Sequence, residues 1–165
     1  MIKNAIKKTC IILCSCVFIG CSQNKANSEI QLYYGTWVVS SYKTICSESD
    51  CFAVVKSPQE HIAQRHKVII SKELYSSEIT GLGEWKIKNP IYVREPDENG
   101  KKVFYIYGKP LNIPAWNKLS SAELTTAINN QIKDKNYLTI ISIGADGKVI
   151  DTDGTHEYYL EKELN

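Results

Sequence analysis

The fold class is decided by residues 137–161, which read YLTIISIGADGKVIDTDGTHEYYLE. Two turn signals, Asp146-Gly147 and Asp153-Gly154, divide this stretch into three runs that are rich in β-branched and aromatic residues. Asp-Gly pairs favour the tight turns that join antiparallel strands. The segment therefore predicts a C-terminal β-meander.

The same pattern continues upstream, where two helices interrupt it. Each helix begins with a capping box, in which Ser57 pairs with Glu60 before a short helix that ends near Arg65, and Ser120 pairs with Glu123 before a longer amphipathic helix. The whole chain is therefore predicted to be mainly β with one or two helices, as an antiparallel barrel or a small sandwich. Upstream strands are expected at residues 33–42, 67–71, 84–88, 91–94 and 103–107.

The first twenty residues predict an export signal. A basic start with Lys3, Lys7 and Lys8 precedes a short apolar stretch from Thr9 to Gly20. That stretch is too short to cross a hydrocarbon core of about 30 Å, which needs about 20 residues. Cleavage before Cys21 would remove three lysines and no acid, so the formal charge would fall from +2 to −1. We therefore expect a single exported domain and no nucleic-acid partner, because no basic stripe would remain.

The end of the apolar stretch, Phe18-Ile19-Gly20-Cys21, resembles the lipobox of bacterial lipoproteins, although that family usually has Leu in place of Phe18. The resemblance implies a signal peptide at residues 1–20 and acyl chains such as palmitate on Cys21. A polar stretch at 21–30 would then serve as a flexible tether. A second candidate lipobox, Leu13-Cys14-Ser15-Cys16, would leave a stunted apolar region, and an ordinary secretion signal is the other alternative.

Lipidation would also fix the location of the protein. Two or more acyl chains hold a protein on a membrane stably, at about 0.8 kcal/mol per buried CH₂. The chain is therefore expected on a cell membrane, through the lipid on Cys21. Because Ser22 rather than aspartate follows the cysteine, the resemblance to lipoproteins of diderm bacteria favours the outer membrane, facing the periplasm, if the host has one.

The cysteines predict one structural disulfide. The signal peptide takes three of the six cysteines and lipidation takes Cys21, which leaves Cys46 and Cys51. A remaining pair in an exported domain usually forms a disulfide, and a loop this small gains only about 2 kcal/mol from it. Redox or metal chemistry is less favoured, because the spacing is not C-x-x-C and no second pair supplies ligands.

The tripeptide Gly35-x-Trp37, followed by the closing meander, resembles the lipocalin-like barrels of the calycin group. In that family the tryptophan plugs the closed end of the barrel, and a basic residue on the last strand packs over it. The resemblance implies one lipocalin-like domain at residues 31–165, with Lys162 as a candidate for the basic residue. The chain departs from the family because its helix at 120–133 precedes the last strands instead of following the barrel. Trp37 is also compatible with a plain core role.

No set of catalytic residues is visible. The chain contains no G-x-S-x-G, no Walker loop and no glycine-rich dinucleotide turn. His61 and His66 are five residues apart, which puts them on different helix faces, so we expect surface histidines rather than a metal pair. The His156 side chain is expected either to have its hydrogen bonds satisfied within the protein or to be exposed to solvent. Residues 146–157 have the length of a calcium loop, but Asp151 stands where an EF-hand needs glycine. We therefore expect no enzyme, no cofactor and no metal.

Aromatic residues supply the candidates for binding. The ten tyrosines and three tryptophans fit a core, a cavity lining, a sheet surface or a protein contact surface. The loop at 109–118 is the most apolar irregular segment and is predicted to be a recognition loop. The first hypothesis is a barrel that binds a small apolar ligand. The alternative is an inhibitor or immunity lipoprotein that blocks an enzyme or toxin in the envelope. The candidate ligand- or partner-binding residues are Trp37, Tyr105, Tyr107 and Trp116.

Overall fold

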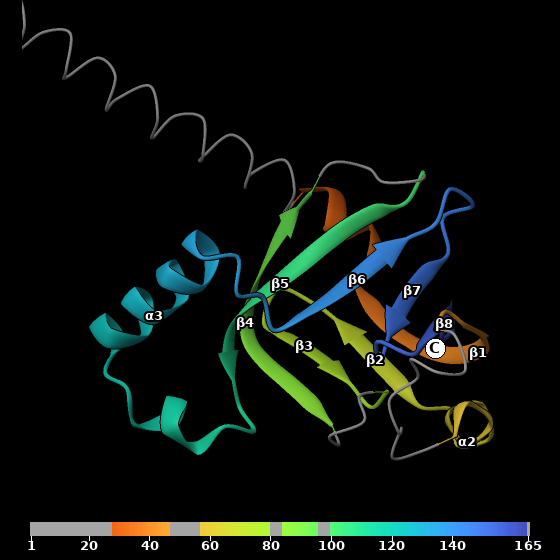
Figure 1. Cartoon of the computed structure of the whole chain (residues 1–165), viewed down its shortest axis with the longest axis horizontal. Helices are drawn as coiled ribbons and strands as arrows, with labels where there is room; N and C mark the ends of the chain where they lie inside the picture. Colours follow the sequence, from red (N-terminus) through yellow and green to blue (C-terminus); the bar gives the residue numbers. More distant parts are fainter. Residues whose placement is uncertain (1–27, 47–56, 80–83, 96–99, 165) are drawn as a thin grey trace, which may run out of the picture.

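The computed structural model describes residues 28–46, 57–79, 84–95 and 100–164 (Figure 1). Within these ranges eight antiparallel strands close into one barrel, in which each strand pairs with its neighbours in sequence and the last pairs with the first. This confirms the mainly β fold class, and the closed sheet makes it a barrel rather than a sandwich. The strands are β1 (Gly35–Thr44), β2 (Lys67–Ile70), β3 (Leu74–Ser77), β4 (Trp85–Arg94), β5 (Lys102–Pro110), β6 (Thr139–Ile143), β7 (Val149–Thr152) and β8 (His156–Lys162).

Several predictions from the sequence fall outside the described ranges. They concern the signal peptide at 1–20, the lipidated Cys21, most of the tether and Cys51. Cys46 is described and lies just beyond the end of β1. Lipidation of Cys21 and the Cys46–Cys51 disulfide therefore stay predictions.

Both predicted capping boxes are present. Ser57 caps α2 (Pro58–Ala63), and Ser120 caps α3 (Ser121–Lys133), each through reciprocal bonds with the glutamate three residues later. Such a box satisfies two backbone N–H groups that a helix start would otherwise leave without partners. The described chain also contains two short 3-10 helices, η1 (Gln31–Tyr33) and η2 (Pro114–Lys118), and residues 28–30, directly before η1, are helical as well.

The strand pattern differs from the prediction at two places. β3 was not predicted, because its four residues, Leu74 to Ser77, give too little alternation to indicate a strand. The expected break at Asn89-Pro90 is a β-bulge inside one continuous strand, β4, where the register with β5 shifts. Proline cannot donate to a sheet ladder, and Asn89 adopts a positive φ of 48°, so a bulge accommodates both residues.

Inward-facing side chains fill the barrel. Four aromatic rings among them, Tyr75, Tyr92, Phe104 and Tyr158, expose at most 1% of their surface. An eight-stranded barrel has an interior just wide enough for side chains to fill or for one small ligand. Here the rings and the aliphatic side chains around them are almost completely buried, so they form a packed core. The core includes Trp37, Val39, Val68, Ile70, Tyr75, Ile87, Tyr92, Phe104, Ile106, Ile141, Ile143, Val149, Tyr158 and Leu160.

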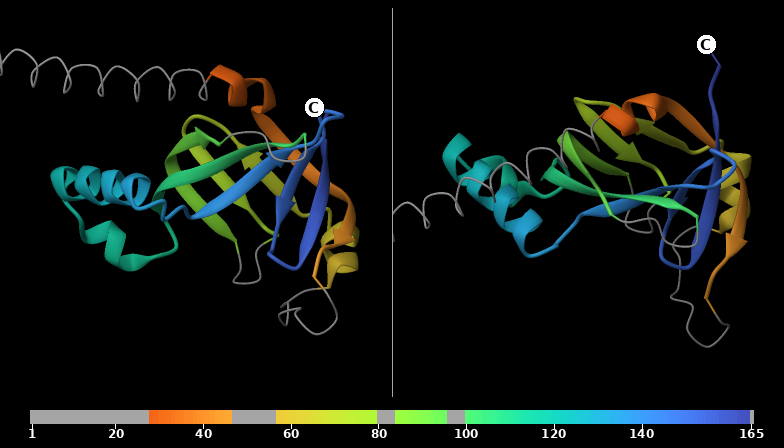
Figure 2. Two further views of the ribbon diagram at one scale, coloured as in Figure 1. Left: turned by 45° about the horizontal axis from the view of Figure 1, so that its top comes forward. Right: turned by 90° about the horizontal axis from the view of Figure 1, so that it is seen from above.

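The barrel has two distinct ends. Odd-numbered strands run in one direction and even-numbered strands in the other, because all neighbours are antiparallel. We call the end at which β1 begins the proximal end; it carries η1, the turn at residues 71–73 and the C-terminal residues (Figure 2). The opposite end, the distal end, carries α2 and the long connection that leaves β5. The 3-10 helix η1 and the predicted recognition loop therefore lie at opposite ends.

The chain closes the proximal end before β1 begins. Ile30 is fully buried in the core, and the Glu29 carboxylate lies 2.9 Å from Arg94 and 2.6 Å from Lys102. Glu29 and Ile30 were predicted to belong to a flexible tether because their neighbours are polar. That boundary is wrong for these two residues, because the ends of β4 and β5 supply partners that are distant in sequence.

The features implied by the lipocalin resemblance meet at this end. Trp37 Nε1 donates to the Tyr33 carbonyl over 2.8 Å. Lys162 pairs with Trp37 across the β1–β8 ladder, and its Nζ lies 5.6 Å from the centroid of the indole ring. The basic residue predicted to pack over Trp37 is therefore in place, at a distance at which a cation and an aromatic face attract.

Candidate functional site

The connection between β5 and β6 forms an arm, residues 111–138, that stands away from the barrel wall (Figures 1 and 2). Neighbouring antiparallel strands usually need a loop of 2–5 residues. Here the connection instead contains η2 and α3. None of the residues in these two helices is buried. The arm is therefore far longer than strand pairing requires. Its two helices add no buried residue to the barrel, and Leu138, at the end of the arm, packs against the barrel core.

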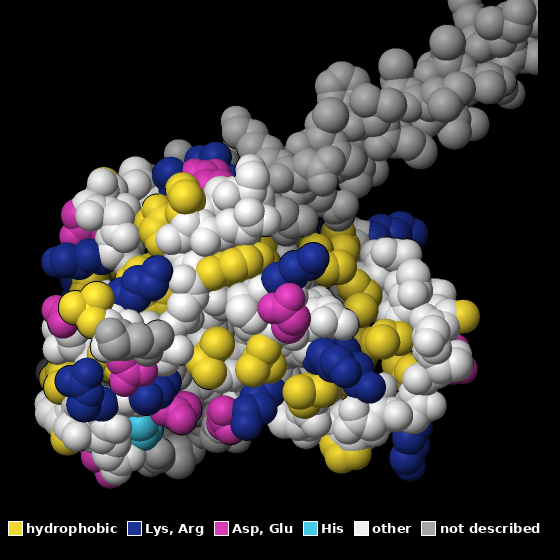
Figure 3. Space-filling model, turned by 180° about the vertical axis from the view of Figure 1, so that it is seen from behind, with side chains coloured by type: hydrophobic (Ala, Val, Ile, Leu, Met, Phe, Trp, Pro, Cys, Tyr) yellow, Lys and Arg dark blue, Asp and Glu magenta, His cyan; other side chains and the backbone are white. Residues whose placement is uncertain are grey.

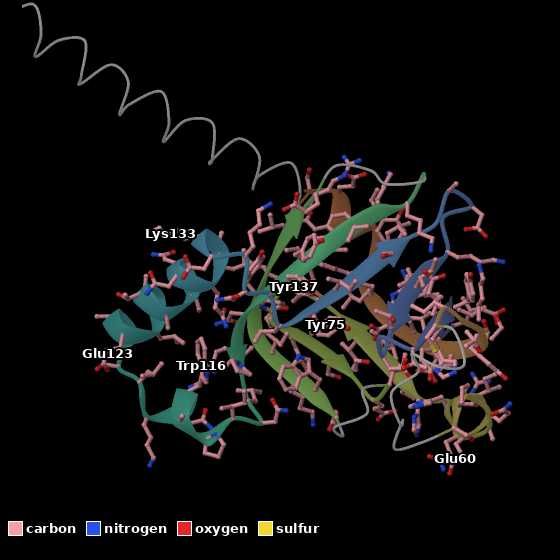
Figure 4. All side chains as sticks on the ribbon, viewed as in Figure 1. Glu60, Tyr75, Trp116, Glu123, Lys133 and Tyr137 are labelled. Atoms are coloured by element: carbon pink, nitrogen blue, oxygen red, sulfur yellow. The ribbon has the colours of Figure 1, made fainter. Side chains whose placement is uncertain are left out.

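Apolar side chains line the arm without being buried by it. Leu111 is exposed, and Trp116 on η2 is half-buried between η2 and α3 (Figure 4). On α3 the predicted apolar face is also only half-buried, at Leu124, Ile128 and Ile132. In Figure 3, where the arm lies to the right, apolar side chains lie between lysines on its surface. Apolar surface that a monomer leaves uncovered and rims with charge is typical of an interaction site.

Tyrosines anchor the arm to the outer face of the barrel. Tyr105 and Tyr107 alternate along β5 with inward-facing Phe104 and Ile106, so they face outward, yet Tyr107 is buried at 2% exposure. Tyr137 lies at the end of the arm (Figure 4), and its ring meets that of Tyr105 at 4.5 Å. Burial, and then the charge of Glu95, raises the pKa of Tyr107 above its usual value.

Hydrogen bonds fix the return of the arm to the barrel. At the end of α3, Lys135 adopts a positive φ of 55°, and Asn136 N donates to Gln131 O over 2.8 Å. This is the Schellman arrangement that ends many helices. Leu138 N then donates to Ile106 O over 2.9 Å. The base of the arm is thus tied to β5, while the apolar side chains farther out stay accessible.

The predicted binding residues separate into two groups. Tyr105, Tyr107 and Trp116 belong to the arm and its base, whereas Trp37 lies in the core near the proximal end. The predicted recognition loop at 109–118 includes Leu111 without singling it out, and Tyr137 was not among the predicted binding residues; both are exposed in the arm. The signal for Tyr137 was its place between a helix end and a strand start, where an aromatic side chain can bridge the two.

A buried carboxylate lies inside the barrel near its distal end. Asp151 is 1% exposed and accepts hydrogen bonds from Ser77 Oγ at 2.7 Å, Tyr75 Oη at 3.2 Å and Thr152 N at 2.8 Å. Burial raises the pKa of Asp151 to about 6, although these hydrogen bonds act in the opposite direction. Because Asp151 is almost completely buried, we assign it to the core rather than to a substrate site.

All three histidines are buried, which corrects the prediction of surface histidines. Arg65 adopts a positive φ of 50°, and His66 N donates to His61 O over 3.0 Å. This Schellman ending folds the chain back beneath the helix and brings the two side chains together. Their Nδ1 atoms lie 2.6 Å apart. Spacing on an ideal helix predicted separation, because it assumed that the helix continued through His66.

The contact between His61 and His66 extends to Gln64, because His66 Nε2 lies 2.7 Å from Gln64 Oε1. For the two Nδ1 atoms to form a hydrogen bond, one ring must donate and the other must accept. The ring of Tyr158 packs against His61 at 5.0 Å, which ties the pair to the barrel core.

The turn before β8 is organised by Asp153. Its carboxylate accepts from Tyr158 Oη at 2.7 Å and from the backbone N–H groups of Thr155 and His156. Burial opposes the charge, but these hydrogen bonds hold the pKa of Asp153 below its ordinary value. Burial and the bond to Asp153 raise the pKa of the Tyr158 hydroxyl. Among the described residues no group of three or more histidine, cysteine, aspartate and glutamate side chains is placed to hold a metal ion.

Comparisons with known protein families, with curated proteins and with solved structures found no match for this chain. No helix in the described part of the chain is long and apolar enough to span a membrane.

Proposed function

We propose that this chain is a membrane-anchored lipoprotein of the cell envelope whose arm binds another protein, as an inhibitor or immunity factor that blocks an enzyme or toxin. The lipobox resemblance at Cys21 supports the anchor. The observation that carries the binding role is the arm itself, which keeps Leu111, Trp116 and the apolar face of α3 outside any core.

Packing of the barrel favours a protein partner over a small apolar ligand. The lipocalin-like binding of such a ligand stays a prediction, and it requires space inside the barrel. Tyr75, Phe104 and Tyr158 fill the described interior and are fully buried. A ligand would have to displace these rings, and a cavity that opens in a close-packed core costs several kcal/mol.

The chemistry of the arm indicates the kind of partner surface. The half-buried apolar side chains of α3 recur at helical spacing, which suits insertion into an apolar groove. Trp116 supplies the large aromatic side chain that commonly dominates binding energy. Lysines outnumber acidic residues around them, so an apolar groove with an acidic rim would be complementary. The charged residues of the arm and its base are Lys109, Lys118, Glu123, Lys133, Asp134 and Lys135.

Site-specific photo-crosslinking in the native host tests this proposal. A photoreactive residue replaces Trp116 in the full chain, and a matched variant carries it at Lys148, which is exposed in the β6–β7 turn at the proximal end. We expect one discrete crosslinked protein from position 116 and none of that mass from position 148. The purified partner should then lose activity when the lipoprotein is added. Identical crosslinking from both positions, or no discrete product from position 116, contradicts the proposal.

A further inference from the structure

A hollow of about 330 Å³ lies on the outside of the barrel at its proximal end. The end of η1 forms one side of it, the β2–β3 turn forms the second, and the bulge of β4 forms the third. Its volume suits a small polar group of about ten non-hydrogen atoms with some water. The residues that line it are Gln31, Tyr34, Lys72, Glu73, Asn89 and Pro90.

Backbone and ring contacts hold the walls of this hollow in place. Asn89 N donates to Glu73 O over 2.8 Å, which joins the bulge to the turn. The Tyr34 ring packs against the Tyr92 ring at 6.4 Å, and Tyr92 Oη donates to Ser71 O over 2.9 Å. The hollow is therefore a preformed feature of the fold rather than a gap between loose side chains.

The polar side chains around the hollow have unused binding capacity. Within the described ranges the Gln31 and Asn89 amides and the Lys72 ammonium make no hydrogen bond or ion pair. Glu73 acts on Tyr34 through its charge, which adds to burial in raising the pKa of that hydroxyl. One cation and one anion thus lie side by side with two free amides, a lining that suits a zwitterion better than a purely anionic group.

The position of the hollow indicates where such a zwitterion would come from. Six residues separate Cys21 from Ser28, so an extended chain spans at most about 25 Å between them. Acyl chains on Cys21 would therefore keep the proximal end close to the bilayer surface. Leu32 in η1 and Leu164 after β8 are 75% and 91% exposed at this same end. Glu163 N donates to Thr36 O over 2.9 Å, which places the neighbouring Leu164 beside the start of β1.

We propose that the proximal end of the barrel docks on the membrane surface and that the hollow binds the headgroup of a phosphatidylethanolamine lipid. The phosphate lies beside Lys72, and the primary ammonium donates to Glu73 and to the amide oxygens of Gln31 and Asn89. Leu32 and Leu164 enter the interface between headgroups and acyl chains. This inference rests on the proposed lipid anchor, and it leaves the distal arm turned toward the aqueous compartment.

Hydrogen–deuterium exchange of the lipidated protein tests the inference. The protein is placed in vesicles of phosphatidylcholine alone, in vesicles that also contain phosphatidylethanolamine or phosphatidylglycerol, and in detergent. We expect amides of residues 31–34 and 71–73 to exchange about tenfold more slowly with phosphatidylethanolamine than in the other settings, as for a site that is about ninety percent occupied. Amides of α3 should exchange at one rate throughout. Incorporation into vesicles reports on the anchor separately.

Variants assign the effect to the hollow. Lys72→Gln and Glu73→Gln should each remove the preference for phosphatidylethanolamine, while Lys118→Gln on the arm should retain it. All three side chains are exposed, so the barrel should fold in each variant. Equal exchange in all vesicles, or a preference that survives both Lys72→Gln and Glu73→Gln, would overturn the proposal. Loss of vesicle incorporation would instead contradict the lipid anchor.

Discussion

At the scale of single residues, Asp151 is the most informative side chain. Its carboxyl group has a pKa of about 6 in the folded protein, against an ordinary value of 3.8, because it is buried. The folded state therefore binds its proton more tightly than the unfolded state does. Stability from this group is fully present below pH 4 and is lost as the pH rises through about 6.

Asp151→Asn removes this titration while it keeps the size of the side chain. We expect the free energy of unfolding of the variant, relative to the wild type, to increase by roughly 2 kcal/mol between pH 4 and pH 7. Urea unfolding at a series of pH values measures the difference. Asp146→Asn is the control, because the hydrogen bond from Lys148 N lowers the pKa of that exposed carboxyl, so its trend should not rise with pH. If the difference in the free energy of unfolding between Asp151→Asn and the wild type did not change with pH, burial would not raise the pKa of Asp151.

Arg65 shows how one residue sets the geometry of a neighbourhood. Its positive φ ends α2 and lets His66 fold under His61. The sequence predicted that the helix ends near Arg65. It did not predict the left-handed backbone conformation of Arg65, because arginine, unlike glycine, gives no local signal for that conformation. Burial of the histidines followed from that turn and could not be predicted from spacing alone.

Arg65→Gly should therefore stabilise the protein. Glycine reaches this φ without steric cost, so we expect a gain of about 0.5–1 kcal/mol in the free energy of unfolding. Arg65→Ala is the matched control, since alanine also removes the exposed side chain but gains nothing at this φ. Thermal and urea unfolding of both variants measure the effect. Equal stability of the two variants would mean that the backbone conformation at this position is unimportant.

At the scale of elements, short sequence motifs predicted the helix starts and turns that they form. The capping boxes at Ser57 and Ser120 located the starts of α2 and α3, and the two Asp-Gly turns located the meander. β3 was missed because its pairing with β2 and β4, rather than its own sequence, makes it a strand. The sequence also indicated a recognition loop at 109–118, but the arm extends through α3 to residue 138, since the helix that follows the loop has no core to join.

The arm should carry most of the binding energy for a protein partner. Trp116→Ala should weaken the affinity of the purified partner about 30-fold or more, equivalent to about 2 kcal/mol, as expected for a large aromatic side chain at an interface. Leu164→Ala, at the opposite end of the barrel, should leave the affinity unchanged. Isothermal titration in detergent measures both. Similar affinities for the two variants would remove the arm from the interface.

At the scale of the whole molecule, the chain before β1 belongs to the barrel. Ile30 fills the proximal end of the core and Glu29 pairs with Arg94 and Lys102. The sequence predicted a tether that included both residues because their neighbours are polar, and only closure of the barrel creates their partners. A tether that continues into the core would fix the orientation of the barrel relative to the lipid.

Ile30→Ala tests this assignment. Removal of a fully buried isoleucine should lower the free energy of unfolding by about 2–5 kcal/mol. Leu32→Ala, two residues away but largely exposed, should change it by no more than about 0.5 kcal/mol. Urea unfolding of both variants supplies the comparison. Equal, small effects would place residues 28–30 outside the folded domain.

We expect an acylated Cys21 to anchor a filled barrel that binds a protein rather than a small apolar molecule. Native mass spectrometry of the mature protein, purified from its host and released from detergent in the instrument, tests this expectation. We expect a chain that begins at acylated Cys21, is two hydrogens lighter through the Cys46–Cys51 disulfide, and carries no stoichiometric apolar ligand other than a phospholipid. A chain without acyl groups, or one apolar molecule other than a phospholipid retained per barrel, would contradict this expectation.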